Sequence, residues 1–287
     1  MNAPGISTVS PATSDIPVVL IRPHQGWFNF ELQELQRYRE LLFFLVWRDV
    51  LVRYKQAAIG VAWVVLQPLL TMVVFTVIFG QFAKLPSDGL PYPIFAYTAL
   101  LPWNYFAQAI SRSGISLVSN SNLISKVYFP RLVIPIAGAL GPLVDFAISF
   151  VILLVMMAWY GIMPTWGVLA LPFFMLLAVA AAVAVSLYLA ALNVTYRDVG
   201  HAIPFLVQFW MYASPVVYSV TIIPEKWRWL YSLNPMVGVI EGFRWALLGK
   251  EEPDFTVIAV GIGVVLVLML GGLIYFKRTE RFFADII

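Results

Sequence analysis

Cysteine is absent from this chain of 287 residues, and histidine is almost absent. Without a thiol the chain has no disulfide framework, no thiolate nucleophile and no cysteine-ligated metal site. Its two histidines, His24 and His201, stand far apart in the sequence. We therefore expect no metal site and no metalloenzyme.

Charge is also scarce: charged residues make up 11% of the sequence, and hydrophobic residues 61%. A typical globular domain carries about 25% charged residues. A water-soluble fold of this size could not cover so much apolar side chain with so few charges. We infer that lipid, rather than water, surrounds most of the chain.

Six stretches reach the roughly 20 mostly apolar residues that a membrane-spanning helix needs. They are residues 60–82, 91–110, 132–160, 168–193, 202–220 and 255–276. The third is too long for a straight crossing and contains Gly141 and Pro142, so we expect a tilt or break near its start. The sequence thus predicts an all-α integral membrane protein whose residues 58–287 form a domain of six transmembrane helices.

The N-terminal part has a different composition. Residues 1–30 are rich in Pro, Ser, Thr and Gly and are predicted to be a disordered cytoplasmic leader. Residues 31–57 mix charged and apolar side chains without Pro or Gly, which predicts an amphipathic helix lying in the cytoplasmic interface. Asp49 and Arg53 interrupt its apolar side. The alternative is a charged lead-in to the first span, but the length of the segment favours the interfacial helix.

Positive charge predicts the orientation. If the N-terminus is cytoplasmic, most Lys and Arg residues outside the spans fall on the cytoplasmic side, as the positive-inside rule requires. Six spans return the C-terminus to that side, where Lys277 and Arg278 end the last helix. We predict a multi-pass protein of the cytoplasmic (inner) membrane with both termini in the cytoplasm.

Three connections carry more information than the spans. Residues 112–131 contain a polar centre, SNSNLISK, that favours a short helix, and residues 193–201 read NVTYRDVGH. Residues 221–250, between spans five and six, are too polar to span and too apolar for a free loop. A pair of short re-entrant external helices shielded by protein fits this last segment.

The order of these features resembles the membrane subunit of ABC-type polysaccharide exporters, which include the bacterial O-antigen, capsule and teichoic-acid exporters. The similar stretches are YKQAAIGVAWVVLQPL at the start of span one, NSNLISKVYFPRLVIP, LNVTYRD and SPVVY…NP…EGFR. The resemblance covers residues 31–287. Each motif alone is weak, and their order and spacing carry the match.

The resemblance implies a homodimer of permease subunits, each docked to a separate cytoplasmic ABC ATPase subunit, of which there are two copies. Its substrate would be a lipid-linked polysaccharide, and the chain itself would not be an enzyme and would have no catalytic residues. Consistently, the sequence has no GxxxxGK[ST] phosphate loop. We expect the partner to bind ATP and Mg²⁺, with no cofactor in this chain and no nucleic-acid partner.

The resemblance also implies which positions contact the ATPase. These coupling positions are Arg48, Asp49, Ser119, Asn120, Asn122, Lys126, Tyr196, Arg197 and Asp198. The alternative for Arg197 and Asp198 is a polar cap that ends span four. The alternative for Lys126 is a headgroup anchor.

Aromatic residues suggest a path for sugar, because C–H groups of sugar rings stack on aromatic faces without binding tightly. The candidate channel-lining residues are Trp63, Phe75, Phe205, Phe209 and Tyr212. The last three recur at i, i+4 and i+7 and share one helical face. Packing against a neighbouring span explains them equally well, and Trp and Tyr also anchor any membrane protein at its interfaces.

We expect residues 221–250 to form an external gate that closes an idle channel. The candidate gate residues are Trp227, Trp229, Tyr231, Glu241, Phe243 and Arg244. Glu241 and Arg244, spaced i and i+3, are expected to pair at the low-dielectric boundary. A headgroup anchor without a gating role is the alternative.

One carboxylate, Asp145, lies well inside a predicted span and is a functional candidate for that reason. No second acid accompanies it, which argues against a proton-coupled carrier. Two other functions stay open. A membrane transferase acting on lipid-linked sugars would need acids or His clustered at one interface, and only the family resemblance excludes an ABC exporter of drugs or small lipids.

Overall fold

The computed structural model describes residues 36–55, 58–249 and 254–286, all within the unit Glu31–Ile287. The predicted leader, residues 1–30, and residues 31–35 and 56–57 of the predicted interfacial helix lie outside the described residues. Every regular element in the described ranges is a helix. The elements are α2 (Arg39–Lys55), α3 (Ala58–Phe75), η1 (Thr76–Phe82), α4 (Tyr92–Ser119), α5 (Ser121–Lys126), α6 (Val133–Leu140), α7 (Leu143–Tyr160), η2 (Trp166–Ala170), α8 (Leu171–Thr195), α9 (Val199–Tyr212), η3 (Val220–Ile222), α10 (Glu225–Tyr231), α11 (Pro235–Leu248) and α12 (Phe255–Ile286).

Four helical stretches in the described part of the chain are long and apolar enough to cross a membrane. They are Ala62–Phe82, Val133–Tyr160, Trp166–Thr195 and Phe255–Phe283. They coincide with the first, third, fourth and sixth predicted spans. The all-helical fold is therefore confirmed, with four candidate membrane spans in the described residues where six were predicted.

The second predicted span lies within α4, a helix of 28 residues that continues to Ser119. The fifth prediction, one helix over residues 202–220, is wrong beyond Tyr212, where α9 ends after 14 residues. At 1.5 Å per residue α9 is about 21 Å long, less than the roughly 30 Å of a hydrocarbon core. The cause is local: Pro215 has no N–H to donate and disfavours helical geometry at Ser214.

The expected break in the third span is confirmed. α6 ends at Leu140, and α7 begins at Leu143. Between them lie Gly141 and Pro142, and a proline cannot continue the helical hydrogen-bond ladder.

Local sequence also fixes the ends of α11. The Asn234 side chain accepts a hydrogen bond from the backbone N–H of Met236, and Pro235 takes the first helical position. The helix stops at Gly249, whose φ of +66° lies in the left-handed region that glycine adopts without a penalty. The NP dipeptide and this glycine thus define an independent helix in the segment predicted to be re-entrant.

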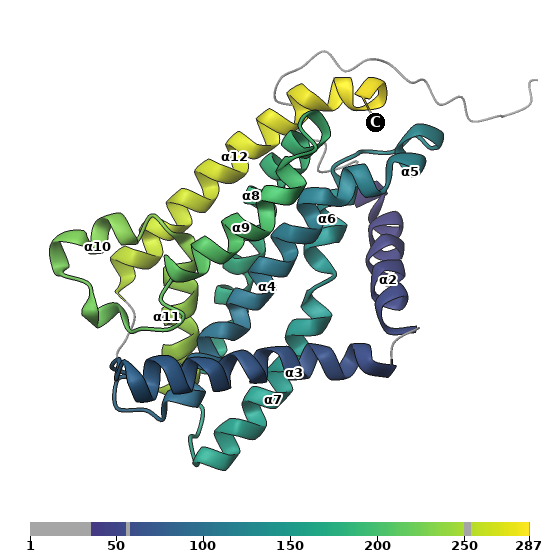
Figure 1. The fold of residues 1–287 in the computed structure, drawn as a ribbon. Coiled ribbons are helices and arrows are strands. Elements are labelled where there is room, and N and C mark those ends of the chain that lie inside the picture. Colours follow the sequence, from purple (N-terminus) through teal and green to yellow (C-terminus); the bar gives the residue numbers. More distant parts are fainter. Residues whose placement is uncertain (1–35, 56–57, 250–253, 287) are drawn as a thin grey trace, which may run out of the picture. The chain divides into compact units, whose positions relative to one another are not determined.

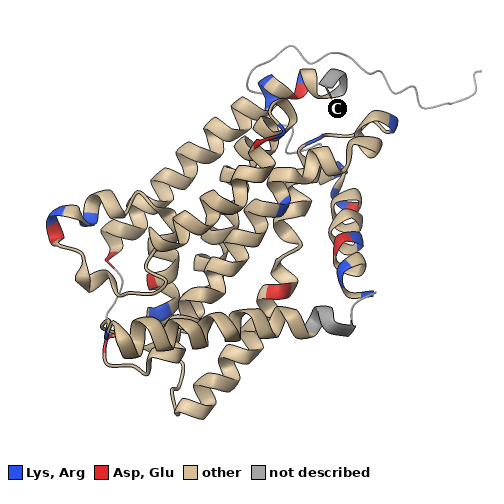
Figure 2. Ribbon diagram, viewed as in Figure 1, with Lys and Arg blue, Asp and Glu red and all other residues tan. Residues whose placement is uncertain are grey.

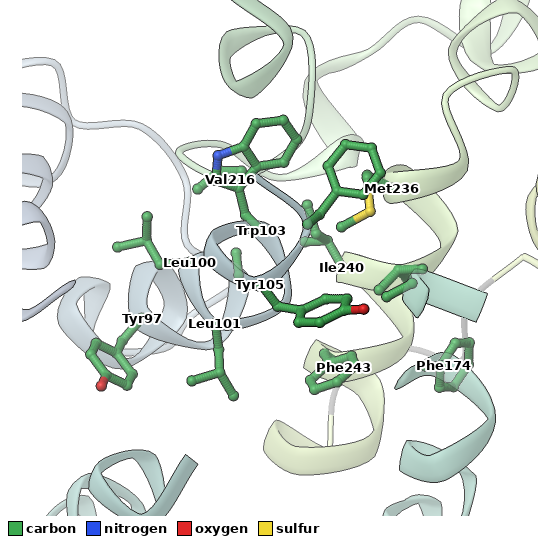
Figure 3. Packing of buried hydrophobic residues seen from close by; sticks show 14 of the residues in the cluster. Tyr97, Leu100, Leu101, Trp103, Tyr105, Phe174, Val216, Met236, Ile240 and Phe243 are labelled. Carbon is green, nitrogen blue, oxygen red and sulfur yellow. The ribbon is translucent and has the colours of Figure 1, made fainter. Parts of the chain in front are cut away.

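α8 is the central helix of the bundle: it packs against α4 and α12, and the three run side by side in Figure 1. Its buried face is rich in alanine, and small residues let helix backbones approach closely where no hydrophobic force drives association in lipid. The largest buried cluster joins α4, α8 and α11, and Figure 3 shows Tyr105, Phe174 and Phe243 within it. In Figure 2 charged residues gather on α2, on α10 and near helix ends, with long uncharged stretches between.

We predict that Gly242→Ala destabilises the bundle. A Cβ at Gly242 would lie 2.2 Å from the ring of the buried Phe174, so α8 and α11 would have to separate. Overpacking of this kind costs about 1–3 kcal/mol. The control is Gly263→Ala in α12, where a Cβ meets nothing within 4 Å. The melting temperature in detergent should fall for Gly242→Ala and stay unchanged for Gly263→Ala. Equal melting temperatures of the two variants would refute the packing argument.

Candidate functional site

One hydrophobic cluster gathers the elements that carry the predicted coupling residues. Buried side chains from α2, α4, α5, α8 and α12 meet in it. They include Leu45, Leu117, Ile124, Val194 and Phe283. Val194 lies in the last turn of α8, just before the YRD turn. The three segments that carry the predicted coupling residues, α2, the α4–α5 junction and the YRD turn, therefore all adjoin this cluster.

Arg48 links two of these segments directly. Its Nη2 donates to Oδ1 of Asp49 at 2.8 Å and to Oδ1 of Asn120 at 3.0 Å. The amide of Asn120 in turn donates to the carbonyl of Ser116 at 2.8 Å. Three predicted coupling residues therefore form one hydrogen-bonded group between α2 and the α4–α5 junction, half-exposed to its surroundings.

The YRD turn, residues 196–198, follows α8 and carries two exposed charged side chains. Tyr196, Arg197 and Asp198 are exposed, and the side chains of Arg197 and Asp198 bond to no residue of the described ranges. Asp198 stands at the N-cap of α9 without a side-chain capping bond. Whether these two residues only end span four or contact a partner stays open.

The remaining coupling candidates are surface residues. Ser119, Asn122 and Lys126 are exposed, and the Ser119 hydroxyl donates to the carbonyl of Ile115 at 3.0 Å. They lie at the end of α4 and along α5, beside the Arg48–Asn120 bond.

Arg131, from the YFPR motif, fastens the α5–α6 loop to the end of α12. Its backbone N–H donates to Oε1 of Glu280 at 3.3 Å, and its guanidinium donates to the Glu280 carbonyl. The guanidinium also lies 6.0 Å from the ring of Phe283. This contact gives the motif a structural role in the cluster.

Asp145 has partners that the sequence reasoning missed. It is 4% exposed, forms an ion pair with Arg53 and accepts a hydrogen bond from the Tyr54 hydroxyl, both from α2. Arg112 of α4 lies 3.7 Å away. Burial, followed by the bond to Asp145, raises the pKa of Tyr54 to about 12, so its hydroxyl stays protonated and donates. The available signal was Arg53, whose position on the apolar side of the predicted helix indicated an inward-facing partner.

The predicted channel aromatics separate into two groups. Phe205, Phe209 and Tyr212 are at least half-exposed along one face of α9, and Trp63 of α3 is 55% exposed. Phe75 is buried against Phe79, with ring centroids 5.6 Å apart. Its position corresponds to core packing, whereas the other four present aromatic faces outside the chain.

The external segment forms two helices of different character. Trp227 and Trp229 on α10 are exposed, and the Tyr231 hydroxyl lies 2.8 Å from that of Tyr218. The expected Glu241–Arg244 pair is confirmed at 3.1 Å. Phe243, another candidate gate residue, is only 1% exposed and lies in the core of the chain.

Arg244 does more than pair with Glu241. Its two terminal nitrogens donate to the carbonyls of Tyr218, at 3.3 Å, and Val216, at 3.2 Å. Its guanidinium lies 3.6 Å above the ring of Phe95. The residue thus holds the irregular backbone after α9 against α4 and α11.

In the described part of the chain no group of His, Asp and Glu is arranged to hold a metal ion. The buried charges Asp145 and Arg244 are paired, with Arg53 and Glu241 respectively.

Comparison with known proteins decides the family. The sequence model of the ABC-2 type transporter family matches residues 40–248, a range that contains every predicted coupling and gate residue. The chain belongs to the ABC-2 type transporter family. Within this ABC-2 chain, the matched range runs through the helices from α2 to α11.

Curated relatives match this ABC-2 chain over nearly their whole length. The O-antigen export system permease protein RfbA of Myxococcus xanthus is 32% identical over 255 residues, 88% of this chain and 97% of that protein. RfbA of Klebsiella pneumoniae is 28% identical, covering 86% of this chain and 95% of that protein. The polysialic acid transport protein KpsM of Escherichia coli is 22% identical, covering 88% and 96%.

We predict that Arg244→Met strongly destabilises the protein. The substitution leaves the carbonyls of Val216 and Tyr218 and the carboxylate of Glu241 without their donor, and breaking a buried pair in this way costs about 3–5 kcal/mol. The control is Lys226→Met, a cation lost from the exposed helix α10. Thermal unfolding of the two purified variants measures the difference, and similar melting temperatures would show that Arg244 is dispensable.

Proposed function

We propose that this chain is the membrane subunit of an ATP-driven exporter that moves a lipid-linked polysaccharide across the cytoplasmic membrane. The observation that carries the proposal is the near full-length similarity to permeases for two glycans, O-antigen and polysialic acid. The similarity to YadH of Escherichia coli, named only as an inner membrane transport permease, covers 26% of this chain. The balance favours an O-antigen or similar cell-surface glycan over drugs or small lipids.

In this proposal ATP is bound and hydrolysed by a separate subunit. The exposed Arg197 and Asp198 and the Arg48–Asn120 pair form the surface on which that subunit rests. Since these segments share a cluster with α8 and α12, a displacement of the surface reaches the central helices of the bundle. Two permease chains and two ATPase chains make the transporter.

We further propose six crossings with both termini cytoplasmic. α4 supplies the second crossing. The fifth combines α9 with residues 213–220. Arg244 donates to the carbonyls of Val216 and Tyr218 in this stretch, and irregular backbone at membrane depth requires such partners within protein. α10 and α11 then lie toward the outer leaflet, where the exposed tryptophans of α10 suit a headgroup anchor or the rim of a gate.

The first test concerns coupling. The double variant Arg197→Ala, Asp198→Ala should remain in the membrane at normal levels while surface polysaccharide falls by about tenfold or more, because charge pairs at an interface contribute about that factor. The matched control is Arg39→Ala, Glu40→Ala, a neighbouring pair of opposite, exposed charges at the start of α2. Normal surface polysaccharide in the first variant would refute the docking surface.

A second test concerns the division of labour. The chain purified alone should neither bind nor hydrolyse ATP, and it should co-purify with an ATPase as two copies of each, measured by native mass spectrometry. Deleting its gene should abolish the surface glycan and leave lipid-linked glycan inside the cell. Nucleotide binding by the isolated chain, or normal surface glycan in the deletion strain, would overturn the proposed function.

A further inference from the structure

A groove of about 550 Å³ opens among α2, α3, α4 and α7. One wall is a single face of α4, on which Asn104, Gln108, Ser111 and Arg112 recur at i, i+4, i+7 and i+8. A row of polar side chains on a helix proposed to cross the membrane is costly unless it meets polar partners. The polar row therefore indicates that the groove binds a polar ligand.

The hydrogen bonds within the groove leave amide groups unused. Ser111 donates to the carbonyl of Ala107 at 2.8 Å, and Oε1 of Gln108 accepts from Arg112 at 3.2 Å. The side chains of Asn104 and of Gln67, which faces the groove from α3, bond to no residue that the structure describes. Each amide offers two donors and an acceptor, so the groove presents donors and acceptors together.

At the floor of the groove two guanidinium groups flank one buried carboxylate. Asp145 is paired with Arg53 and lies 3.7 Å from Arg112, so both cations share its carboxylate. A phosphate would have to compete with this buried anion for the same two guanidinium groups. A neutral ligand rich in hydroxyl groups can bond to the amides of the groove and leave these ion pairs in place.

The groove also has aromatic surface. Trp63 lines it from α3 and is 55% exposed, so an apolar face is accessible beside the amides. Tyr105 forms part of the wall, fixed by its hydroxyl's hydrogen bond to the carbonyl of Ala139 at 3.1 Å. Hydroxyl-binding amides next to an aromatic face match the two kinds of surface on a sugar ring.

We propose that this groove is a glycan-binding subsite. In it Gln67, Asn104 and Gln108 hydrogen-bond to the hydroxyls of a neutral sugar unit whose C–H face lies on Trp63. The subsite rests on the proposed function and deepens it, since it names the part of the chain that holds the exported glycan.

The first test removes the amides while keeping their volume. Asn104→Leu with Gln108→Leu should lower glycan export by about tenfold, because hydrogen bonds to a polar ligand are lost and the polar groups of that ligand are left unpaired. The single variant Gln108→Asn keeps an amide at this position and should retain most of the export. The matched control is Gln81→Leu, an exposed amide on η1 outside the groove. Membrane level and co-purification with the ATPase should equal those of the wild type in every variant.

The second test uses the natural lack of cysteine. Single variants Asn104→Cys and Gln81→Cys, in nanodiscs with the complete transporter, are labelled with a water-soluble maleimide. The probe is lipid-linked glycan extracted from cells that lack this chain. At a concentration that nearly saturates the subsite, this glycan should slow the labelling of Asn104→Cys by about fivefold or more. The labelling rate of Gln81→Cys should not change.

Several results would overturn the subsite. Equal protection by a polyprenyl phosphate without sugar would assign the groove to the lipid headgroup, and no labelling without glycan would mean that another chain covers it. Normal export by the double leucine variant in a strain where gene deletion abolishes export would refute the subsite alone. Normal surface glycan after gene deletion would refute the proposed function, and the subsite with it.

Discussion

The guanidinium of Arg244 is the contact on which the second half of the fold depends. After α9 ends at Tyr212 the chain runs through backbone without regular helix, and its carbonyls have no helical partners there. Arg244 supplies donors to Val216 and Tyr218 from α11, pairs with Glu241 and stacks on Phe95 of α4. Because an unsatisfied carbonyl or a lone charge is expensive in a medium without water, the short α9 requires this arginine.

Hydropathy alone predicted most of the architecture. Four predicted spans coincide with helices long enough to cross, since continuous apolar runs of about 20 residues have few alternatives to a spanning helix. The break after Leu140 was also readable, because proline removes a backbone donor wherever it stands. The end of α9 was missed because hydropathy does not report where the backbone leaves the helix, although the Ser214–Pro215 step carried that information locally.

The site divides in the same way into local and non-local features. The Glu241–Arg244 pair followed from a spacing of three residues, and it is present. The partners of Asp145 were out of reach, since Arg53 lies 92 positions away and no single sequence states which helices touch. The burial of Phe243 and Phe75 was hidden for a related reason: an aromatic face predicts contact with something apolar and leaves open whether that is lipid, sugar or a neighbouring helix.

α2 is attached at two points five residues apart, by Arg48 to Asn120 and by Arg53 to Asp145. Its outward side carries Phe43 and Trp47, stacked on each other and exposed. Sliding this helix would take Arg53 and Tyr54 away from the buried Asp145 carboxylate and leave it with the more distant Arg112 of α4, and weakening a buried ion pair in this way is costly. The two contacts tie α2 to both α4 and α7, so α2 cannot shift along its own axis without breaking at least one of them.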